Sequence, residues 1–407
     1  MGDLARRAAS HLRFLCEDLP GRAVGSSGNR AATDWFAEQI SALDFIVETP
    51  EFDCLDWSHN GAELRVAGRT LPVEPSPYSL GCASRAKLTV AETLEALERA
   101  EVAGTILLLR GSLAKEQLMP KNFPFYNPDE HRQIIGCLER KQPLAILAAT
   151  GRDLGMAGGI SPFPLIEDGD FAIPCAHMTE SVGEELAALA GEEVDLTIRA
   201  KRTPAIGCNV EAHKGSGQGP RIVVFAHIDA KLGTPGALDN AAGVSTLLLL
   251  AELLQPRTPG VRLELIALNG EDYYSAPGEQ LFLSRNANRF DEILLGINID
   301  GAGDVAGEIA FSLYGCTPHL EQTIRTAFLA YPGMIEGEAW YQSDHSLFLM
   351  HDRPALAVTS ARFSELWAEI AHTPKDLPER VSPRRLEDLA RVLQQVVLKT
   401  SIYGFGD

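Results

Sequence analysis

The chain has 407 residues, of which 45% are hydrophobic and 22% charged. This length and composition allow a large buried core and predict a soluble, enzyme-sized protein with two domains. The formal net charge of -19 argues against a nucleic-acid partner, which would need clusters of Lys and Arg to neutralise phosphates.

The N-terminus and the cysteines predict a cytoplasmic location. Residues 1–8 continue into an amphipathic rather than an apolar pattern, so we expect neither a secretory signal nor a membrane span, and no membrane partner. The seven cysteines are odd in number and form no Cys-x-x-Cys pair. This usage suits reduced thiols in a cytoplasm.

The first two hundred residues change texture along the chain. Apolar periodicity predicts two helices in the first fifty residues, separated by a glycine-rich break at 21–28, and then a strand at 45–49. Short β-type runs and a helix at 90–99 follow between residues 56 and 202. We interpret this stretch as a smaller β-rich inserted domain, and we assign it no chemistry because its apolar runs end in neither acidic nor imidazole residues.

From residue 208 onward the pattern alternates between strand and helix, which predicts parallel pairing. The expected elements are strand 221–226, helix 241–254, strand 261–268, a helix within 277–284, strand 293–299, further elements at 309–313, 318–329 and 355–359, and a helix at 384–400. The predicted fold class is therefore α/β, with a mixed, mostly parallel sheet flanked by helices. Residues 1–55 and 203–407 would form this domain, and residues 56–202 the insert.

Three of these strands run directly into side chains that can bind metal. His227 ends the first strand, Glu271 and Asp272 follow the second, and Asp300 follows the third. The carboxyl ends of strands in an open α/β sheet are where ligands bind, because the loops there present side chains from fixed positions. A fourth acid, Asp239, precedes the apolar run of the next helix.

These residues match the needs of a pair of divalent ions. Two ions about 3.5 Å apart need roughly five ligands, a bridging carboxylate and open positions for water and substrate. The fifth ligand should be a later histidine, and His372 is the best candidate because it falls in a polar loop after a predicted strand. Asp229 could accept the second N–H of the His227 ring and fix its tautomer.

The order of the motifs resembles one known family. His-x-Asp at 227–229, Pro-Gly-Ala-x-Asp-Asn-x-x-Gly at 235–243, the acidic pair at 271–272, Asn-x-Asp at 298–300, Ser-Asp-His at 343–345 and His-Thr-x-x-Asp at 372–376 are similar to those of the co-catalytic, di-zinc metallo-aminopeptidases. Bacterial leucyl aminopeptidases and glutamate carboxypeptidase II typify that family. Jointly these motifs are specific, whereas each alone would be weak.

The resemblance implies a role for each position. His227 and Asp300 would hold one zinc ion, Asp272 and His372 the other, and Asp239 would bridge the two. Glu271 would be the general base, and Tyr341 could help to hold the tetrahedral oxyanion. Residues 56–202 resemble the protease-associated insert that many members carry.

Plainer interpretations exist for single residues. A lone aspartate at such a position is more often a helix cap or a solvated loop residue, and Asp239 could simply cap the following helix. Tyr341 could be part of a pocket wall, and His345 is better explained as a structural residue than as a ligand. The pair Glu271-Asp272 also departs from the usual Glu-Glu, which gives the second ligand a shorter arm.

The predicted function is that of a zinc-dependent exopeptidase with two zinc ions per chain. Within that class we predict an aminopeptidase that acts on a peptide or aminoacyl substrate. The ligands alone do not distinguish aminopeptidase from carboxypeptidase activity. The alternatives are a non-catalytic binding protein with the same fold and a single-zinc acyltransferase similar to glutaminyl cyclase. A homodimer is possible.

Overall fold

The computed structural model describes residues 2–19, 21–124, 127–151, 160–215, 219–256, 260–273 and 275–403. The chain divides into two compact units. Unit 1 comprises Met1–Cys54 and Ile206–Asp407, and unit 2 comprises Leu55–Ala205. The boundaries that we predicted for the insert, residues 56 and 202, lie close to these limits.

Unit 1 is built on an eight-stranded mixed sheet, which confirms the predicted α/β class. The central strands β12, β11, β13 and β16 are parallel, and the antiparallel pairs β1–β10, β10–β12 and β14–β16 lie toward the edges. The strands lie in the order β1 (Ile46–Glu48), β10 (Val210–Lys214), β12 (Arg262–Leu268), β11 (Arg221–His227), β13 (Ile293–Ile299), β16 (Ala355–Ser360), β14 (Ile309–Tyr314) and β15 (Met334–Glu336).

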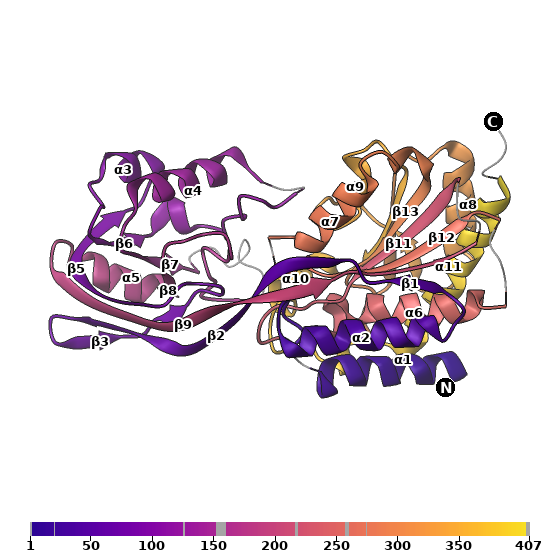
Figure 1. The fold of residues 1–407 in the computed structure, drawn as a ribbon, viewed down its shortest axis with the longest axis horizontal. Coiled ribbons are helices and arrows are strands. Elements are labelled where there is room, and N and C mark those ends of the chain that lie inside the picture. The colour runs from indigo at the N-terminus through magenta and orange to yellow at the C-terminus, as the bar shows by residue number, and fades with distance from the viewer. Residues whose placement is uncertain are drawn as a thin grey trace. The chain divides into compact units, whose positions relative to one another are not determined.

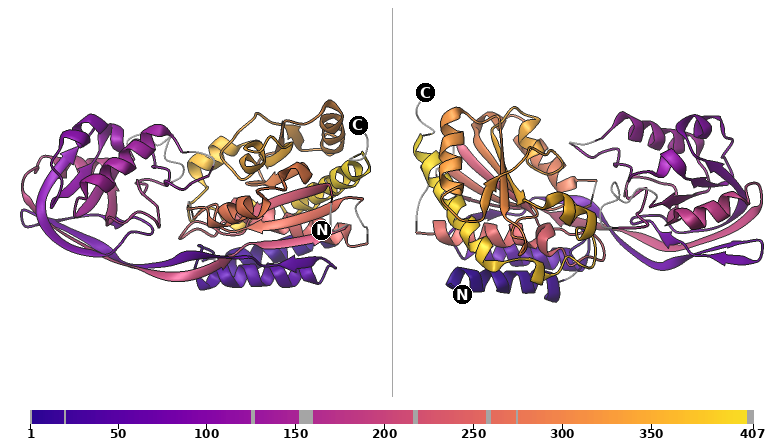
Figure 2. Two further views of the ribbon diagram at one scale, coloured as in Figure 1. Left: turned by 45° about the horizontal axis from the view of Figure 1, so that its top comes forward. Right: turned by 180° about the vertical axis from the view of Figure 1, so that it is seen from behind.

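Helices cover both faces of this sheet. They are α1 (Asp3–Arg13), α2 (Ser27–Ser41), α6 (Ala242–Leu254), α7 (Pro277–Asn286), α8 (Pro318–Phe328), α9 (Ser346–Leu349), α10 (Phe363–Glu369) and α11 (Pro383–Tyr403). On one face α6 packs on β11 and β12 and also contacts α1 and α11 (Figure 1). The right view of Figure 2 shows the yellow α11 on the same side of the sheet as the indigo α1.

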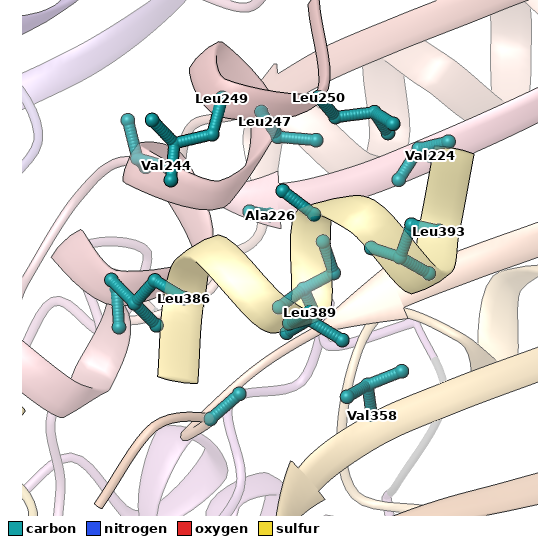
Figure 3. Close-up of a cluster of buried hydrophobic side chains, with 14 of the residues drawn as sticks. Val224, Ala226, Val244, Leu247, Leu249, Leu250, Val358, Leu386, Leu389 and Leu393 are labelled. Carbon is teal, nitrogen blue, oxygen red and sulfur yellow. The ribbon is translucent and has the colours of Figure 1, made fainter. Parts of the chain in front are cut away.

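The alternation of side chains along β11 explains why both faces are buried. Val224 and Ala226 point toward the cluster that includes Leu247 of α6 and Leu389 of α11 (Figure 3). Phe225 points the other way, and its ring lies 4.8 Å from that of Phe282 in α7 and 4.7 Å from that of Phe348 in α9. A strand buried on both faces is apolar throughout, which is why β11 shows as a continuous apolar run in the sequence.

Helix α6 is apolar enough to resemble a membrane span. The window Ala237–Leu254 has a mean hydropathy of 1.4, but 83% of it is buried inside unit 1. A helix that is apolar all round belongs in the core of a large protein as readily as in a membrane. Its contacts with the sheet, α1 and α11 explain its composition.

Unit 2 holds a second sheet whose strands lie in the order β3 (Arg69–Leu71), β2 (Glu51–Val66), β9 (Glu193–Cys208), β5 (Cys82–Ala91), β6 (Ile106–Leu109), β7 (Ala145–Thr150), β8 (Cys175–Thr179) and β4 (Glu74–Pro75). Side chains of α3 (Leu94–Arg99) and α4 (Asp129–Lys141) share one apolar cluster, and those of α5 (Glu180–Ala187) share another. The likeness of this unit to a protease-associated domain stays a prediction.

One element of unit 2 differs from the prediction. The helix expected at 90–99 begins only at Leu94, because Val90 and Ala91 end the strand β5. The Thr93 hydroxyl accepts a hydrogen bond from the Ala96 N–H at 3.2 Å and so caps the helix there.

Candidate metal centre

Three neighbouring parallel strands deliver predicted ligands to one edge of the unit 1 sheet. His227 is the last residue of β11 and pairs with Leu268, the last residue of β12. The Ile228 N–H donates to the Leu268 carbonyl oxygen at 2.7 Å, so the two chains leave the sheet together. Asp300 follows β13 directly, and its N–H still donates to Val358 of β16 at 2.9 Å. The strand ends therefore fix His227, Asp272 and Asp300 beside one another.

Asp239 lies in the short helical turn Ala237–Ala241 before α6. The Asn240 side chain, and not Asp239, accepts the Gly243 N–H at 3.0 Å near the start of the helix. The alternative of Asp239 as a helix cap is therefore wrong. The Asp239 carboxylate instead points to two histidines.

The two carboxylate oxygens of Asp239 face different imidazoles. Oδ1 lies 3.0 Å from Nε2 of His227, and Oδ2 lies 3.1 Å from Nε2 of His372. Asp300 Oδ1 lies 3.6 Å from the His227 nitrogen, and Asp272 Oδ1 lies 3.0 Å from the His372 nitrogen. The five predicted ligands thus form two groups of three that share Asp239.

This donor set fits zinc. Zinc is bound in proteins by imidazole nitrogen and carboxylate oxygen, and catalytic sites supply three protein ligands and keep a position open. Within the described residues, both ring nitrogens of His227 and Oδ1 of Asp272 are buried without a hydrogen bond of acceptable geometry. Buried polar atoms of this kind call for a partner, and a metal ion provides one.

The carboxylates dominate the electrostatics of the centre. Burial alone would lower the pKa of His372, but the carboxylates of Asp272 and Asp239 raise it from 6.5 to about 10. Burial is likewise outweighed at His227, where Asp229, Asp239 and Asp300 raise the pKa well above its ordinary value. In turn, the two histidines lower the pKa of Asp239 even though burial would raise it. The cluster therefore attracts positive charge, either protons or metal ions.

A pH dependence follows for the protein stripped of metal. Because the pKa of His372 is about 10 in the folded state against 6.5 in the unfolded state, its contribution to stability is complete below pH 6.5. That contribution is lost as the pH rises through 10. We expect thermal unfolding of the chelator-treated protein to move to lower temperature between pH 6.5 and 10, and zinc to reduce this fall. A midpoint that stays constant or rises over this range would contradict the assignment.

Glu271 lies next to this cluster but in neither ligand group. It is half-buried, and burial raises its pKa well above the ordinary value of a glutamate. A carboxylate that holds a proton at a higher pH than usual is suited to accept and return one in a reaction near neutrality.

Asp229 joins the two strands that carry the ligands. One of its carboxylate oxygens accepts the Gly270 N–H and the other the Asp272 N–H, both at 2.9 Å. Its Oδ1 lies 3.6 Å from Nδ1 of His227, which is longer than a hydrogen bond. The predicted bond to the imidazole is thus replaced by direct bonds to the loop that holds Glu271 and Asp272.

Two supporting residues were not predicted. Asp376, which is fully buried, accepts the N–H groups of Leu238 and Asp239 at 2.8 and 3.0 Å. Ser343 donates its hydroxyl to Asp300 Oδ2 at 2.7 Å and accepts a bond from Asn298 at 2.8 Å. Both belong to motifs recognised in the sequence, which was the only signal that could have found them.

Tyr341 lies exposed in the loop that precedes the Ser343-Asp344-His345 motif. Its side chain is 56% exposed, and its ring lies 5.6 Å from that of Tyr314. The oxyanion role of Tyr341 stays a prediction. His345 is fully buried with Nε2 2.7 Å from the Trp340 carbonyl oxygen, in keeping with a structural role.

The fold and this cluster together define the class of the chain, that of an α/β metallopeptidase with a zinc-exopeptidase type of sheet. Residues 209–397, which include all five ligands and Glu271, match the family model described as Peptidase family M28. This match to peptidase family M28 covers somewhat less than half of the chain.

Solved structures share the fold over nearly the whole chain. An aminopeptidase from Aneurinibacillus sp. strain AM-1 is 19% identical with a TM-score of 0.73, covering 98% of this chain and 93% of that one. BSAP, a zinc aminopeptidase from Bacillus subtilis, is 19% identical with a TM-score of 0.71, covering 98% and 94%. A glutaminyl cyclase from Porphyromonas gingivalis is 14% identical with a TM-score of 0.53, covering 97% and 99%.

The sequence relatives match a smaller part of the chain than the solved structures do. The probable lipoprotein aminopeptidase LpqL of Mycobacterium tuberculosis is 26% identical over 239 residues, which are 56% of this chain and 44% of that protein. The uncharacterized protein YfbL of Escherichia coli is 26% identical over 238 residues, 46% of this chain and 69% of that one. The match thus spans less than half the length of LpqL.

Proposed function

We propose that this chain is a zinc-dependent aminopeptidase that uses two zinc ions. The observation that carries the proposal is the placement of Asp239, whose two oxygens face His227 and His372 separately. Asp300 completes the first group of ligands and Asp272 the second. A carboxylate that bridges two ions is the feature that a co-catalytic site requires and a single-metal site lacks.

The residues divide the chemistry among them. When bound, zinc supplies a Lewis acid that polarises the scissile carbonyl and makes water more acidic. Glu271 accepts a proton from the attacking water and delivers it to the leaving amine, which is the task that its raised pKa favours. Asp229 and Asp376 hold the loops of Asp272 and Asp239 through backbone N–H groups, so the ligands keep their separation.

The names of related proteins support the aminopeptidase direction. LpqL is described as a probable aminopeptidase, and two of the most similar solved structures are aminopeptidases. A glutaminyl cyclase shares this fold, so the fold alone does not distinguish a peptidase from a glutaminyl cyclase. The cytoplasmic location and the homodimer stay predictions.

An assay of substrate direction tests the proposal. Aminoacyl-aminocoumarins and dipeptides with a free N-terminus should be hydrolysed, while the same compounds with an acetylated N-terminus should not. Chelation should abolish hydrolysis and zinc should restore it. Hydrolysis of N-blocked peptides from the C-terminus, or full activity after chelation, would overturn the proposed function.

A further inference from the structure

The segment that connects α1 with α2 lies outside the stretch matched by the family, yet it reaches the loops of the metal centre. Arg22 in this segment is 1% exposed. Its guanidinium donates four hydrogen bonds, all to backbone carbonyl oxygens: to Ile228 at 3.0 Å, Leu15 at 2.6 Å, Pro235 at 2.8 Å and Gly236 at 2.9 Å. Burying a cation costs free energy unless its N–H groups are hydrogen-bonded. The four carbonyl groups therefore hold Arg22 in one position.

Three of those carbonyl groups belong to segments that also carry predicted metal ligands. Ile228 follows His227 directly, and Pro235 and Gly236 lead into Asp239. Gly236 has a φ of 63°, and a Cβ there would lie 2.9 Å from Nη2 of Arg22. The loop therefore approaches the guanidinium as closely as a glycine allows.

The same loop is held from its other side by Asp376. Arg22 binds the carbonyls of residues 235 and 236, whereas Asp376 binds the N–H groups of residues 238 and 239. Two carbonyl groups and two N–H groups of this loop are thus each bound by the buried side chain of Arg22 or Asp376. The bridging carboxylate of Asp239 sits at the end of this turn.

Asn29 reaches the second ligand loop. Its side-chain amide forms a reciprocal pair with that of Asn269, with nitrogen–oxygen distances of 2.8 and 3.0 Å, and both residues are buried. Asn269 immediately precedes Gly270, Glu271 and Asp272. The Asn29 Nδ2 also donates to the Arg22 carbonyl at 3.0 Å, which ties the two contacts into one unit.

We propose that residues 22–29 act as a positioning clamp for both metal sites, with Arg22 fixing the bridging ligand Asp239 and Asn29 fixing the loop of Glu271 and Asp272. This inference rests on the proposed metal centre and extends it to residues that touch neither metal nor substrate. Residues around a metal site that orient its ligands typically contribute 10-fold to 100-fold to metal affinity.

The test compares two buried arginines of unit 1. Arg22→Met removes the clamp, and Arg221→Met removes a guanidinium that is also 1% exposed but lies at the start of β11, the opposite end of the strand from His227. Zinc bound per folded chain is measured against a competing chromophoric chelator, and the cobalt-substituted proteins are compared by absorption. Arg22→Met should weaken zinc binding by about 10-fold to 100-fold and change the cobalt spectrum, and Arg22→Lys should recover part of the affinity. Arg221→Met should lower the unfolding temperature and keep wild-type affinity.

If Arg22→Met does not fold, Asn29→Leu tests the clamp separately. It should weaken zinc at the site of Asp272 and His372 while the other site stays filled. Wild-type affinity and spectrum in folded Arg22→Met or in Asn29→Leu, or an equal loss in Arg221→Met, would overturn the clamp. A wild-type protein that itself binds fewer than two zinc ions would instead defeat the proposed function.

Discussion

Glu271→Gln is expected to keep both zinc ions and to lose turnover, with kcat lower by about 10² to 10⁴. The amide has the size of the carboxylate but cannot accept the proton of the attacking water. Because Glu271 belongs to neither ligand group, metal binding should be intact. Steady-state kinetics with zinc analysis of the same preparation would check both halves of the prediction.

The pH profile gives this prediction a control. In the wild-type protein the acid limb of kcat reports protonation of the base, and burial places the pKa of Glu271 above the ordinary range for a glutamate. That limb should disappear in Glu271→Gln, while KM changes little. Wild-type turnover in the variant would remove Glu271 from the role of general base.

Asp239→Ala is expected to have the largest effect on metal content. It removes the carboxylate that faces both His227 and His372, so each group of three ligands loses a member. We expect the purified variant to hold no zinc and to show no hydrolysis.

Asp300→Ala provides a matched comparison, because Asp300 belongs to one group only. Elemental analysis of the two variants should find no zinc with Asp239→Ala and about one ion per chain with Asp300→Ala. Two zinc ions retained by Asp239→Ala would show that another residue bridges the metals.

Much of this centre could be predicted because strand ends are visible in a sequence. His227, Asp272 and Asp300 follow apolar runs, and parallel pairing brings such positions to one edge of the sheet. His372 was harder to predict in this way. It lies in a loop, with a φ of 60° at its own backbone, and reaches the cluster through tertiary packing. Its position in a polar loop after a predicted strand and its place in the order of motifs pointed to it.

The shorter arm of Asp272 does not prevent it from reaching the cluster. Its Oδ1 lies 3.0 Å from His372, and its Oδ2 accepts the Lys231 N–H at 3.0 Å. The Asp272 N–H donates to Asp229, which follows β11 closely. This bond holds the Asp272 backbone near β11 and so compensates for its shorter side chain. The sequence showed the substitution but could not show this adjustment.

The contacts made by the supporting residues could not have been predicted, although the motif at 372–376 includes Asp376 itself. Arg22 and Asp376 bind backbone carbonyl and N–H groups of one loop, and such contacts leave no periodicity and no complementary residue in the sequence. The length of β2 and β9, 16 residues each, was also not predicted, since the sequence indicated only short β-type runs in this stretch. Long strands with exposed polar residues on both sides lack the alternation that identifies a strand.

The number of zinc ions bound by the folded wild-type chain tests the central claim most directly. Elemental analysis after dialysis against a fixed low concentration of free zinc should give two ions per chain, lost together with peptide hydrolysis on chelation. A count of one, together with formation of pyroglutamate from an N-terminal glutamine, would contradict the shared Asp239 bridge and the peptidase that we build on it.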